Sequence, residues 1–345
     1  MAIRSVCICG AQVPFTRGGA ELLVESLHQA LTGHGYETDV VSIPFKWYPK
    51  EEIITHSLAW RLIDIEESNG RPIDLVIATK FPSYLVRHSK KVVWLVHQFR
   101  QAYDLFGTPY GDLGFSDEDQ RLKDIVNEMD NNSLSEASKV FAISNNVRER
   151  LLSYNNISSE VLYPPPKDRS YRCDGYGDYI LSVGRLDPLK RTSLLIEAIA
   201  CLKGAKCVIV GVGPEEGKLK QLASSLQVDD RVKFVGYADD STLVDLYANC
   251  LAVYYAPYDE DYGLVPLESF RSRKPVVTTD DAGGTLELVL EGYNGTITVP
   301  DPHDIADGID SLYTSKERAA DLGEAGWEKV QDISWDKTID VLLQQ

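Results

Sequence analysis

Short apolar runs rich in β-branched residues alternate with longer amphipathic segments along the whole chain, and this order constrains the fold more than any other feature. Strands that alternate with helices form parallel sheets that are covered by helices. The expected strands fall into two groups, one on either side of a proline-rich stretch. They are residues 3–9, 38–43, 74–79, 92–97 and 140–144 in the first group, and 179–183, 207–210, 232–235, 251–255, 276–279 and 296–299 in the second.

The length of 345 residues is enough for two domains that each bury a core. Three consecutive prolines at 164–166 hold the backbone extended and prevent a helix from continuing, so we interpret this stretch as the linker. We therefore expect one doubly wound domain over residues 1–165 and a second over residues 166–330. The amphipathic segments that we expect to be helices include residues 20–32, 306–313, 316–330 and 335–343.

The charge balance limits the partners of this chain. It contains 35 Lys+Arg against 52 Asp+Glu, a formal net charge of −17. A strongly acidic protein is repelled by the phosphates of nucleic acids, so we predict no nucleic-acid partner. Any phosphate that the protein binds has to be met by a few cations in loops. Isolated arginines and lysines that follow strands are therefore the residues to consider.

Cysteine usage and hydropathy predict a cytoplasmic protein. The six cysteines are dispersed without a CxxC pair, so neither a zinc site nor a disulfide framework is indicated. Residues 1–10 lead directly into a strand-like pattern without the features of a signal peptide. No apolar run approaches the roughly 20 residues that a membrane-spanning helix needs.

Two loops that follow expected strands carry residues suited to phosphate. Gly18 and Gly19 precede a helix, where backbone amides attract anions, although paired glycines also form simple tight turns. Arg185 and Lys190 follow the strand at 179–183. They can converge on one diphosphate, because arginine offers a planar fork and lysine a point charge. The alternative is that both are ordinary solvated surface cations.

A third loop carries two carboxylates eight residues apart. Glu260 follows the strand at 251–255, and Glu268 lies about a turn and a half into the next helix. Carboxylates accept hydrogen bonds from neighbouring hydroxyls, so the pair suits a ribose and a sugar ring; the alternative is a solvated acidic loop. The chain has no GxxxxGK[ST] loop, and its Gly211-Val212-Gly213 element is followed by two glutamates rather than an open helix terminus. A nicotinamide-dependent dehydrogenase is therefore disfavoured.

Taken together, these residues resemble the retaining glycosyltransferases of family 4. The most specific element is Glu-x7-Glu, which reads EDYGLVPLE from Glu260 to Glu268. The order of GGAE, VHQ, SVGRLDPLKR, VGVGP and KFVGY along the chain supports it, and the resemblance covers nearly the whole chain. It implies the α/β GT-B fold, in which two Rossmann-like doubly wound domains face a central cleft. It also implies that residues 331–345 pack back onto the first domain.

The resemblance assigns roles to individual residues. It implies that Arg185 and Lys190 hold the donor diphosphate. Glu260 contacts the donor sugar, and His97 faces the transferred hexose, so these four residues form the implied catalytic set. Asp261 departs from the family, where a small residue is common, and leaves the identity of the sugar open. No metal or other cofactor is implied, because cations and helix N-termini stabilise the charge on the leaving diphosphate. The implied donor-binding residues are Gly18, Gly19, Val235, Gly236, Tyr237, Gly263, Leu264 and Glu268, with Gly283, Gly284 and Glu287 as further candidates.

The acceptor side is predicted in outline. Residues 75–103 contain five cations and no carboxylate, in a chain that is otherwise acidic, and several aromatic residues lie there or shortly after. We hypothesise that this region receives a phosphate-bearing acceptor such as a polyprenyl-linked glycan, with a peripheral contact at the inner membrane face. The alternative is a solvated face beside a core loop. The cations are Lys80, Arg87, Lys90, Lys91 and Arg100, and the aromatic residues are Phe99, Tyr103, Phe106, Tyr110 and Phe115.

The sequence therefore predicts a cytoplasmic hexosyltransferase of polysaccharide biosynthesis that acts with retention. Its donor is a UDP- or GDP-sugar, with GDP-mannose narrowly favoured over UDP-glucose, and its acceptor is a glycan or a lipid-linked glycan. Two alternatives stay open. One is a GT-B nucleotide-sugar epimerase, which would carry acid and base carboxylates in the first domain and need no acceptor. The other is a non-catalytic partner protein that binds a nucleotide sugar.

Overall fold

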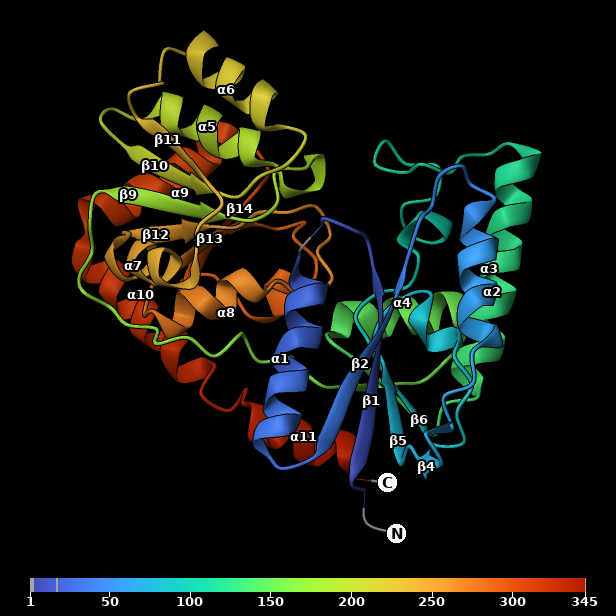
Figure 1. The fold of residues 1–345 in the computed structure, drawn as a ribbon. Helices are drawn as coiled ribbons and strands as arrows, with labels where there is room; N and C mark the ends of the chain where they lie inside the picture. The colour runs from blue at the N-terminus through green and yellow to red at the C-terminus, as the bar shows by residue number, and fades with distance from the viewer. Residues whose placement is uncertain (1–2, 17, 345) are drawn as a thin grey trace. The chain divides into compact units, whose positions relative to one another are not determined.

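The computed structural model describes residues 3–16 and 18–344, and the chain folds into two compact units (Figure 1). Unit 1 comprises Met1–Lys167 and Ile333–Gln345, and unit 2 is Asp168–Asp332. The boundary falls after Lys167, one residue beyond the three prolines at 164–166. Unit 2 is therefore one continuous segment, whereas unit 1 is assembled from the segments on either side of it.

Unit 1 is built on a parallel sheet with the strand order β2-β1-β5-β6-β7-β8. Its central strands β5 and β6 are buried along their whole length, as strands that are covered on both faces have to be. A separate short hairpin, β3–β4, turns at Asn69-Gly70, where both residues have a positive φ. The strands are β1 (Ser5–Gln12), β2 (Glu37–Pro44), β3 (Glu67–Ser68), β4 (Arg71–Pro72), β5 (Leu75–Ala78), β6 (Lys91–Leu95), β7 (Lys139–Ala142) and β8 (Glu160–Val161).

The helices of unit 1 include one that follows unit 2 in the chain. The indole of Trp335, at the start of this helix, lies against Trp94 of β6 with ring centroids 6.2 Å apart. Its Nε1 donates a hydrogen bond to the carbonyl of Pro166 at 3.2 Å. The helices are α1 (Gly19–Gly33), α2 (Glu52–Leu62), α3 (Asp117–Ser135), α4 (Asn145–Asn155) and α11 (Trp335–Leu343), with short 3₁₀ turns η1 (Ser83–Leu85) and η2 (Arg100–Ala102).

Unit 2 is built on a second parallel sheet, with the strand order β11-β10-β9-β12-β13-β14. The chain adds β10 and β11 on one side of β9 and then returns to add β12, β13 and β14 on the other side. The strand order therefore reverses between β9 and β12. The strands are β9 (Tyr179–Val183), β10 (Lys206–Val210), β11 (Val232–Gly236), β12 (Ala252–Tyr254), β13 (Val276–Thr279) and β14 (Gly295–Thr298).

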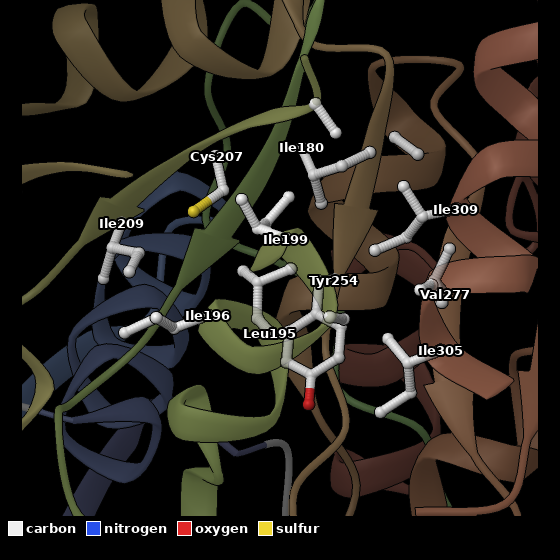
Figure 2. Close-up of a cluster of buried hydrophobic side chains, with 14 of the residues drawn as sticks. Ile180, Leu195, Ile196, Ile199, Cys207, Ile209, Tyr254, Val277, Ile305 and Ile309 are labelled. Atoms are coloured by element: carbon white, nitrogen blue, oxygen red, sulfur yellow. The ribbon is translucent and has the colours of Figure 1, made fainter. Parts of the chain in front are cut away.

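The two faces of this second sheet bury alternate residues of the same strands. Ile180, Ile209 and Val277 point to one face, where Figure 2 shows them packed with side chains of α5 and α9. Leu181 and Val253 point to the other face and pack on residues of α7. Because side chains alternate along a strand, this pattern requires apolar residues at consecutive positions. The continuous apolar runs in the sequence therefore correspond to strands that are buried on both faces.

Side-chain caps fix the starts of several helices in unit 2. Asp239 accepts a hydrogen bond from the Thr242 amide at 2.8 Å, and Asp301 caps a later helix in the same way. Such caps satisfy amides that have no partner within the helix. The helices are α5 (Thr192–Cys201), α6 (Glu216–Ser225), α7 (Asp240–Asn249), α8 (Leu264–Arg271), α9 (Pro302–Thr314) and α10 (Lys316–Lys329), with 3₁₀ turns η3 (Pro188–Lys190) and η4 (Gly284–Glu287).

The predicted α/β class, with two Rossmann-like parallel sheets, is confirmed. The strands at 179–183 and 276–279 and the helix at 335–343 have the predicted bounds. The first strand was predicted at 3–9 but runs from Ser5 to Gln12, because it pairs with β2 as far as Pro44. The fourth strand ends at Leu95, so His97 lies in the loop beyond it. None of the described helices is both long and apolar enough to cross a membrane.

Candidate functional site

The reversal of strand order between β9 and β12 marks the place where unit 2 can bind a ligand. The loops that leave two such strands diverge to opposite sides of the sheet, and a crevice forms at their carboxyl ends. The loop after β9 carries Arg185 and Lys190, and the loop after β12 carries Glu260. The fold therefore brings three of the four residues of the implied catalytic set to one edge of one sheet.

Lys190 and Glu260 form an ion pair that joins the loops after β9 and β12. The Lys190 Nζ donates a hydrogen bond to Glu260 Oε2, and it lies 3.3 Å from the hydroxyl of Tyr255. The side chains of Lys190 and Glu260 are each 21% exposed, so the pair is reachable from solvent. Burial alone would lower the pKa of Lys190, but the carboxylate of Glu260 outweighs it and raises the pKa above the ordinary range. Lys190 is therefore a permanent cation at neutral pH.

Arg185 is the more exposed cation of this edge. Its Nε donates to Asp187 Oδ2 at 2.8 Å, and its side chain is 52% exposed. Asp187 also accepts a hydrogen bond from the Lys190 amide at 3.2 Å through its other oxygen, and so caps η3. One carboxylate thus orients both the arginine and the turn that carries the lysine. An arginine held by its Nε alone keeps further N–H groups for an anion.

The N-terminus of α8 comes next to the same edge. Gly263 has a φ of +92°, and a Cβ at this position would lie 2.8 Å from the Tyr255 ring, so only glycine fits without displacement. Leu264 is the first residue of α8. Helix N-termini present unpaired amides and the positive end of the helix dipole to anions. The predicted pair Gly263 and Leu264 therefore lies where a phosphate would be stabilised.

Glu268, predicted to bind the donor, is buried and does not face solvent. It is only 5% exposed, and each of its carboxylate oxygens already accepts a hydrogen bond. Arg169 donates to Oε1, and the hydroxyl of Tyr247 donates to Oε2 at 2.9 Å. Arg169 lies directly after the unit boundary and also contacts Asp240 and Tyr171. A carboxylate accepts more than two hydrogen bonds, so these contacts orient Glu268 without filling its capacity.

Three further predicted residues lie at the end of β11, two strands away from β9. Gly236 has a φ of +73°, and its carbonyl accepts a hydrogen bond from the Gly211 amide at 2.8 Å. Val235 is half-buried and Tyr237 is 78% exposed. The segment 235–237 is thus at the carboxyl edge of the same sheet as Lys190, with an exposed ring at its end.

The glycines of the loop after β10 have a packing function. A Cβ on Gly211 would lie 1.8 Å from the carbonyl oxygen of Gly184, and one on Gly213 would lie 2.2 Å from that of Leu186. These distances are far below contact, so glycine is required for the β10 loop to lie on the β9 loop. The Gly-Val-Gly element therefore packs against the segment that carries Arg185. This packing role agrees with the prediction that the element is not a dinucleotide-binding loop.

Gly283 and Gly284 bring a second segment against Glu260. A Cβ on Gly283, which has a φ of +60°, would lie 2.7 Å from the backbone nitrogen of Glu260. The Gly284 amide donates to the Glu260 carbonyl at 2.7 Å. Glu287 follows in η4. The sequence did not reveal Arg169, which contacts Glu268, or Tyr255, which contacts Lys190. It also did not reveal Arg191, whose side chain binds the loops after β12 and β13. Of these three residues, only Arg191 could have been suspected from the sequence, because it directly follows the predicted Lys190.

In unit 1 the switch point between β1 and β5 also holds an ion pair. Lys80, after β5, donates to Glu21 in the first turn of α1, and Glu21 accepts the Gly18 amide at 2.9 Å. Gly19 begins α1. The Gly18 amide is thus directed at a carboxylate of its own chain. Beside the pair lies a cavity of about 290 Å³, lined by residues of α1, β1 and β2 that include Gln12 and Glu25.

His97 lies beyond the end of β6 and is half-buried. Its Nδ1 is 2.7 Å from the carbonyl of Gln98, so this nitrogen carries a proton and donates. The His97 carbonyl accepts a hydrogen bond from the Phe81 amide at 3.3 Å. Backbone contacts therefore fix the loop, and the hydrogen bond to Gln98 sets the tautomer of the ring.

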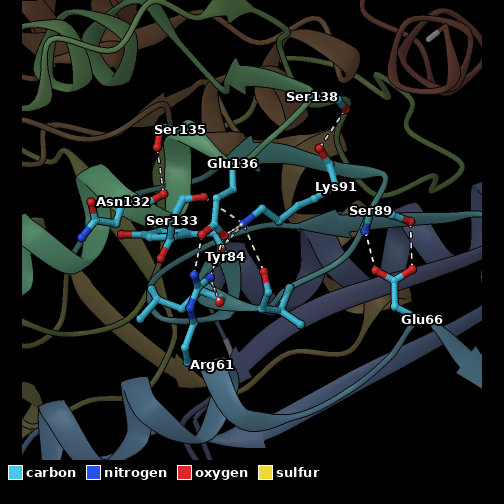
Figure 3. Close-up of polar contacts among 12 residues, drawn as sticks. Arg61, Glu66, Tyr84, Ser89, Lys91, Asn132, Ser133, Ser135, Glu136 and Ser138 are labelled. Carbon is cyan, nitrogen blue, oxygen red and sulfur yellow. Dashed lines mark hydrogen bonds and ion pairs between the residues drawn. The ribbon is translucent and has the colours of Figure 1, made fainter.

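Several cations of the basic segment 75–103 are used internally. Lys91 is buried, and its Nζ donates to the carbonyls of Tyr84, Val86 and Ser133 at 2.8–3.1 Å. Figure 3 shows Lys91 beside Tyr84 and Ser133. Burial lowers the pKa of Lys91 to about 8, although nearby Glu136 raises it in part. Lys80 is bound to Glu21, as described above. Arg100 is paired with Asp104. The segment is therefore less basic at the surface than its composition suggests.

Among residues 3–16 and 18–344 we find no cluster of three or more His, Cys, Asp or Glu side chains arranged to hold a metal ion. The four buried cysteines, Cys7, Cys9, Cys207 and Cys250, and the two others are unpaired thiols.

Comparison with known proteins places unit 2 in a family. Residues 167–329 match the family "Glycosyl transferases group 1". The resemblance to glycosyltransferases inferred from the sequence is therefore confirmed for these residues, which match the group 1 family.

Relatives of the chain carry related names. The chain is 30% identical over 236 residues to a D-inositol 3-phosphate glycosyltransferase of Mycolicibacterium smegmatis, a match that covers 65% of this chain and 54% of that protein. It is 26% identical to the human alpha-1,3/1,6-mannosyltransferase ALG2, over 54% of this chain and 51% of that protein. The match thus spans about half the length of these relatives. An uncharacterized glycosyltransferase of Methanocaldococcus jannaschii is 25% identical over 92% of this chain and 91% of its own.

Solved structures share the fold along the whole chain. Sucrose-phosphate synthase from Thermosynechococcus elongatus superposes with a TM-score of 0.78, covering 99% of this chain and 98% of that chain at 19% identity. Anabaena HepE in complex with UDP-glucose gives a TM-score of 0.70, with 98% of both chains covered at 19% identity.

Proposed function

We propose that the chain is a retaining glycosyltransferase that transfers a hexose from a UDP- or GDP-sugar to a glycan or lipid-linked glycan. The observation that carries this proposal is the arrangement at the switch point of unit 2. There the Lys190–Glu260 pair and the half-exposed Arg185 lie at the same edge of the sheet as the N-terminus of α8, within the segment that matches the group 1 glycosyltransferases. This set combines two cations with a carboxylate that can accept sugar hydroxyls.

The proposed chemistry follows from where charge develops. Breaking the bond between the sugar and the nucleoside diphosphate builds negative charge on the leaving phosphate. Arg185, Lys190 and the α8 N-terminus are fixed before the reaction, so they stabilise that charge without reorganising. Glu260 remains beside Lys190 and accepts hydroxyl groups of the donor sugar, while Glu268 accepts those of the ribose. No divalent metal is needed in this scheme.

The acceptor is proposed to bind unit 1. The cavity beside Lys80 and Glu21 is at the lower end of the size range of ligand pockets, and its lining of carboxylates, amides and one cation suits a hydroxyl-rich sugar. The cations that remain for an acceptor phosphate include the exposed Arg87. A polyprenyl-linked acceptor and a peripheral membrane contact stay part of the proposal. Co-sedimentation with vesicles of 30% anionic lipid at low salt tests that contact, and a protein that stays in the supernatant contradicts it.

The donor is tested by calorimetric titration with UDP, GDP, UDP-glucose, UDP-galactose, UDP-GlcNAc and GDP-mannose, each with and without EDTA. We expect one nucleotide series to bind, with affinity unchanged by EDTA, and favour GDP-mannose because ALG2 is named a mannosyltransferase. The UDP series is favoured instead by the UDP-glucose complex of HepE. The variant Glu268→Ala should bind the same donor at least tenfold more weakly. The exposed Glu317→Gln in α10 is the matched control.

Turnover separates the proposal from its alternatives. Release of nucleoside diphosphate only in the presence of an acceptor supports a transferase. Conversion of the donor to an epimer without any acceptor supports the epimerase, and binding without turnover supports a non-catalytic partner. The anomeric configuration of the product, measured by NMR, tests retention: an inverted product rejects it.

A further inference from the structure

The residue that follows Lys190 has a backbone conformation that glycine normally adopts. Arg191 has a φ of +46° and a ψ of +40°, and it lies between η3 and the first residue of α5. Residues with a side chain are disfavoured in this conformation, because their Cβ approaches the backbone. Such a residue persists only where its surroundings hold it in place. The side chain of Arg191 provides that support.

The guanidinium of Arg191 joins the ends of two neighbouring strands. Its Nε donates to the carbonyl of Ala256 at 2.9 Å, and its Nη2 donates to that of Pro257 at 2.9 Å, both directly after β12. The same group donates to Thr279 Oγ1 at 2.8 Å, at the end of β13. It also forms a two-pronged contact with the carboxylate of Asp281, at 2.7 and 2.6 Å. The side chain is only 11% exposed.

The two loops that Arg191 joins are the ones that enclose Glu260. The Asp259 amide donates to the carbonyl of Asp281 at 2.9 Å, and the Glu260 amide donates to that of Ala282 at 3.2 Å. The Gly284 amide returns a hydrogen bond to the Glu260 carbonyl at 2.7 Å. The Arg191 guanidinium therefore holds the start of the loop after β12 and the start of the loop after β13. The two loops then form backbone hydrogen bonds with each other at Glu260.

We propose that Arg191 is a positioning residue that fixes Glu260 beside Lys190 by joining the loops after β12 and β13. The effect on catalysis rests on the proposed function. The joining of the loops does not, because it is a structural property of unit 2. A guanidinium suits these contacts, since it spreads its N–H donors over two carbonyls, a hydroxyl and a carboxylate. Lysine would keep the charge and lose this geometry.

The chain offers a closely matched control. Arg273 also has a positive φ, at +52°, and lies in unit 2. Its guanidinium pairs with Glu324 at 2.7 Å and lies 4.3 Å from the Trp327 ring centroid. Arg191→Gly and Arg273→Gly therefore remove the same side chain from the same backbone conformation. Only the first removes contacts to the loops that enclose Glu260.

Hydrogen exchange tests the joining of the loops without any ligand. In Arg191→Gly we expect the amides of Asp259, Glu260 and Gly284 to exchange at least tenfold faster than in the wild type. In Arg273→Gly they should exchange as in the wild type. Arg191→Lys is measured alongside, should Arg191→Gly not fold, and is expected to show faster exchange at the same amides. Unchanged exchange at these amides in either Arg191 variant overturns the proposal.

Donor titration tests the catalytic consequence. If Arg191 positions Glu260, Arg191→Gly should lose at least tenfold in affinity for the nucleotide sugar and less for the free nucleoside diphosphate, because Glu260 contacts the sugar. A general loss of structure would weaken both equally, and that result rejects the positioning role. A wild-type protein that binds no nucleotide sugar contradicts the proposed function, and the exchange result then decides the structural inference by itself.

Discussion

Each unit places a lysine–glutamate pair at the switch point of its sheet, but the two pairs differ in their surroundings. In unit 1, Lys80 and Glu21 are 12% and 16% exposed, and Glu21 also accepts the Gly18 amide. Lys80 outweighs burial and lowers the pKa of Glu21. In unit 2, Lys190 and Glu260 are 21% exposed and lie beside an exposed arginine and a helix N-terminus. The pair in unit 1 is thus the more enclosed of the two, whereas the pair in unit 2 lies beside further positive charge for a ligand.

The largest effect is expected from breaking the pair in unit 2. Lys190→Met removes a fixed cation from the charge that develops on the leaving phosphate, so kcat should fall by about 10²- to 10³-fold. Steady-state kinetics with the donor identified by titration measure this change. Lys218→Met, an exposed lysine of α6, is the control. A kcat within threefold of the wild type would remove Lys190 from the mechanism.

Breaking the pair in unit 1 should act on stability instead. Lys80→Met leaves the largely buried carboxylate of Glu21 without its cation, and we expect unfolding free energy to fall by about 2 kcal/mol. Urea unfolding measures this loss, and calorimetry on the same sample should give a donor affinity within twofold of the wild type. A strong loss of donor affinity with little loss of stability would show that the two pairs have the same role.

The pH dependence of stability further distinguishes unit 1, because this unit also buries a carboxyl group in α3. Asp130 is fully buried and accepts a hydrogen bond from the Tyr103 hydroxyl at 2.7 Å. Burial raises the pKa of Asp130 to about 7, although Tyr103 lowers it in part. Between about pH 4 and 7 the folded state therefore binds the proton more tightly than the unfolded chain, so this contribution to stability is full below pH 4 and lost as the pH rises to 7.

Asp130→Asn should remove that dependence. Relative to the wild type, the variant should gain on the order of 2 kcal/mol of stability between pH 5 and pH 8. Urea unfolding at the two pH values measures the gain. Asp124→Asn, at an exposed position of the same helix, should show no such difference. A pH-independent effect of Asp130→Asn would mean that the carboxyl does not titrate in this range.

The smallest effect concerns the exposed arginine of unit 2. Arg185→Ala should lower kcat about tenfold and change KM less, because the interaction strengthens as charge builds on the phosphate. Arg172→Ala is the control, since Arg172 is a similarly exposed arginine of unit 2 that is also bound to an aspartate. Equal changes in KM and in kcat/KM, with kcat constant, would show uniform binding of ground and transition state.

The sequence predicted those parts of the molecule that depend on local pattern. Strands such as β9 and β13 are apolar runs bounded by turn residues, and their bounds were predicted correctly. The positions of Arg185, Lys190 and Glu260 after their strands followed from the same pattern. In contrast, α2, α3 and α4 were not predicted, and neither was the β3–β4 hairpin, although its Asn69-Gly70 turn is a recognisable signal.

The contacts of the site could not be predicted, because they join distant segments. Arg169 is 99 residues from Glu268, and no motif of the sequence marked it. The partner of Lys190 is 70 residues away, and the contacts of Arg191 are 65 to 90 residues away. The basic segment was misleading for the same reason, since burial of Lys91 among carbonyls is a tertiary property. Composition indicates which charges exist, and packing decides which of them a ligand can reach.

The contact of Trp335 with Trp94 has a consequence for how the chain is made. The ribosome delivers residues in order, and domains fold as they emerge. Unit 2 is complete once Asp332 has been synthesised, whereas unit 1 still lacks the helix that begins at Trp335. The segment 1–167 is therefore synthesised before the whole of unit 2, and during that time Trp94 lacks its contact with Trp335. Unit 1 is therefore synthesised first but completed last, when α11 has been made.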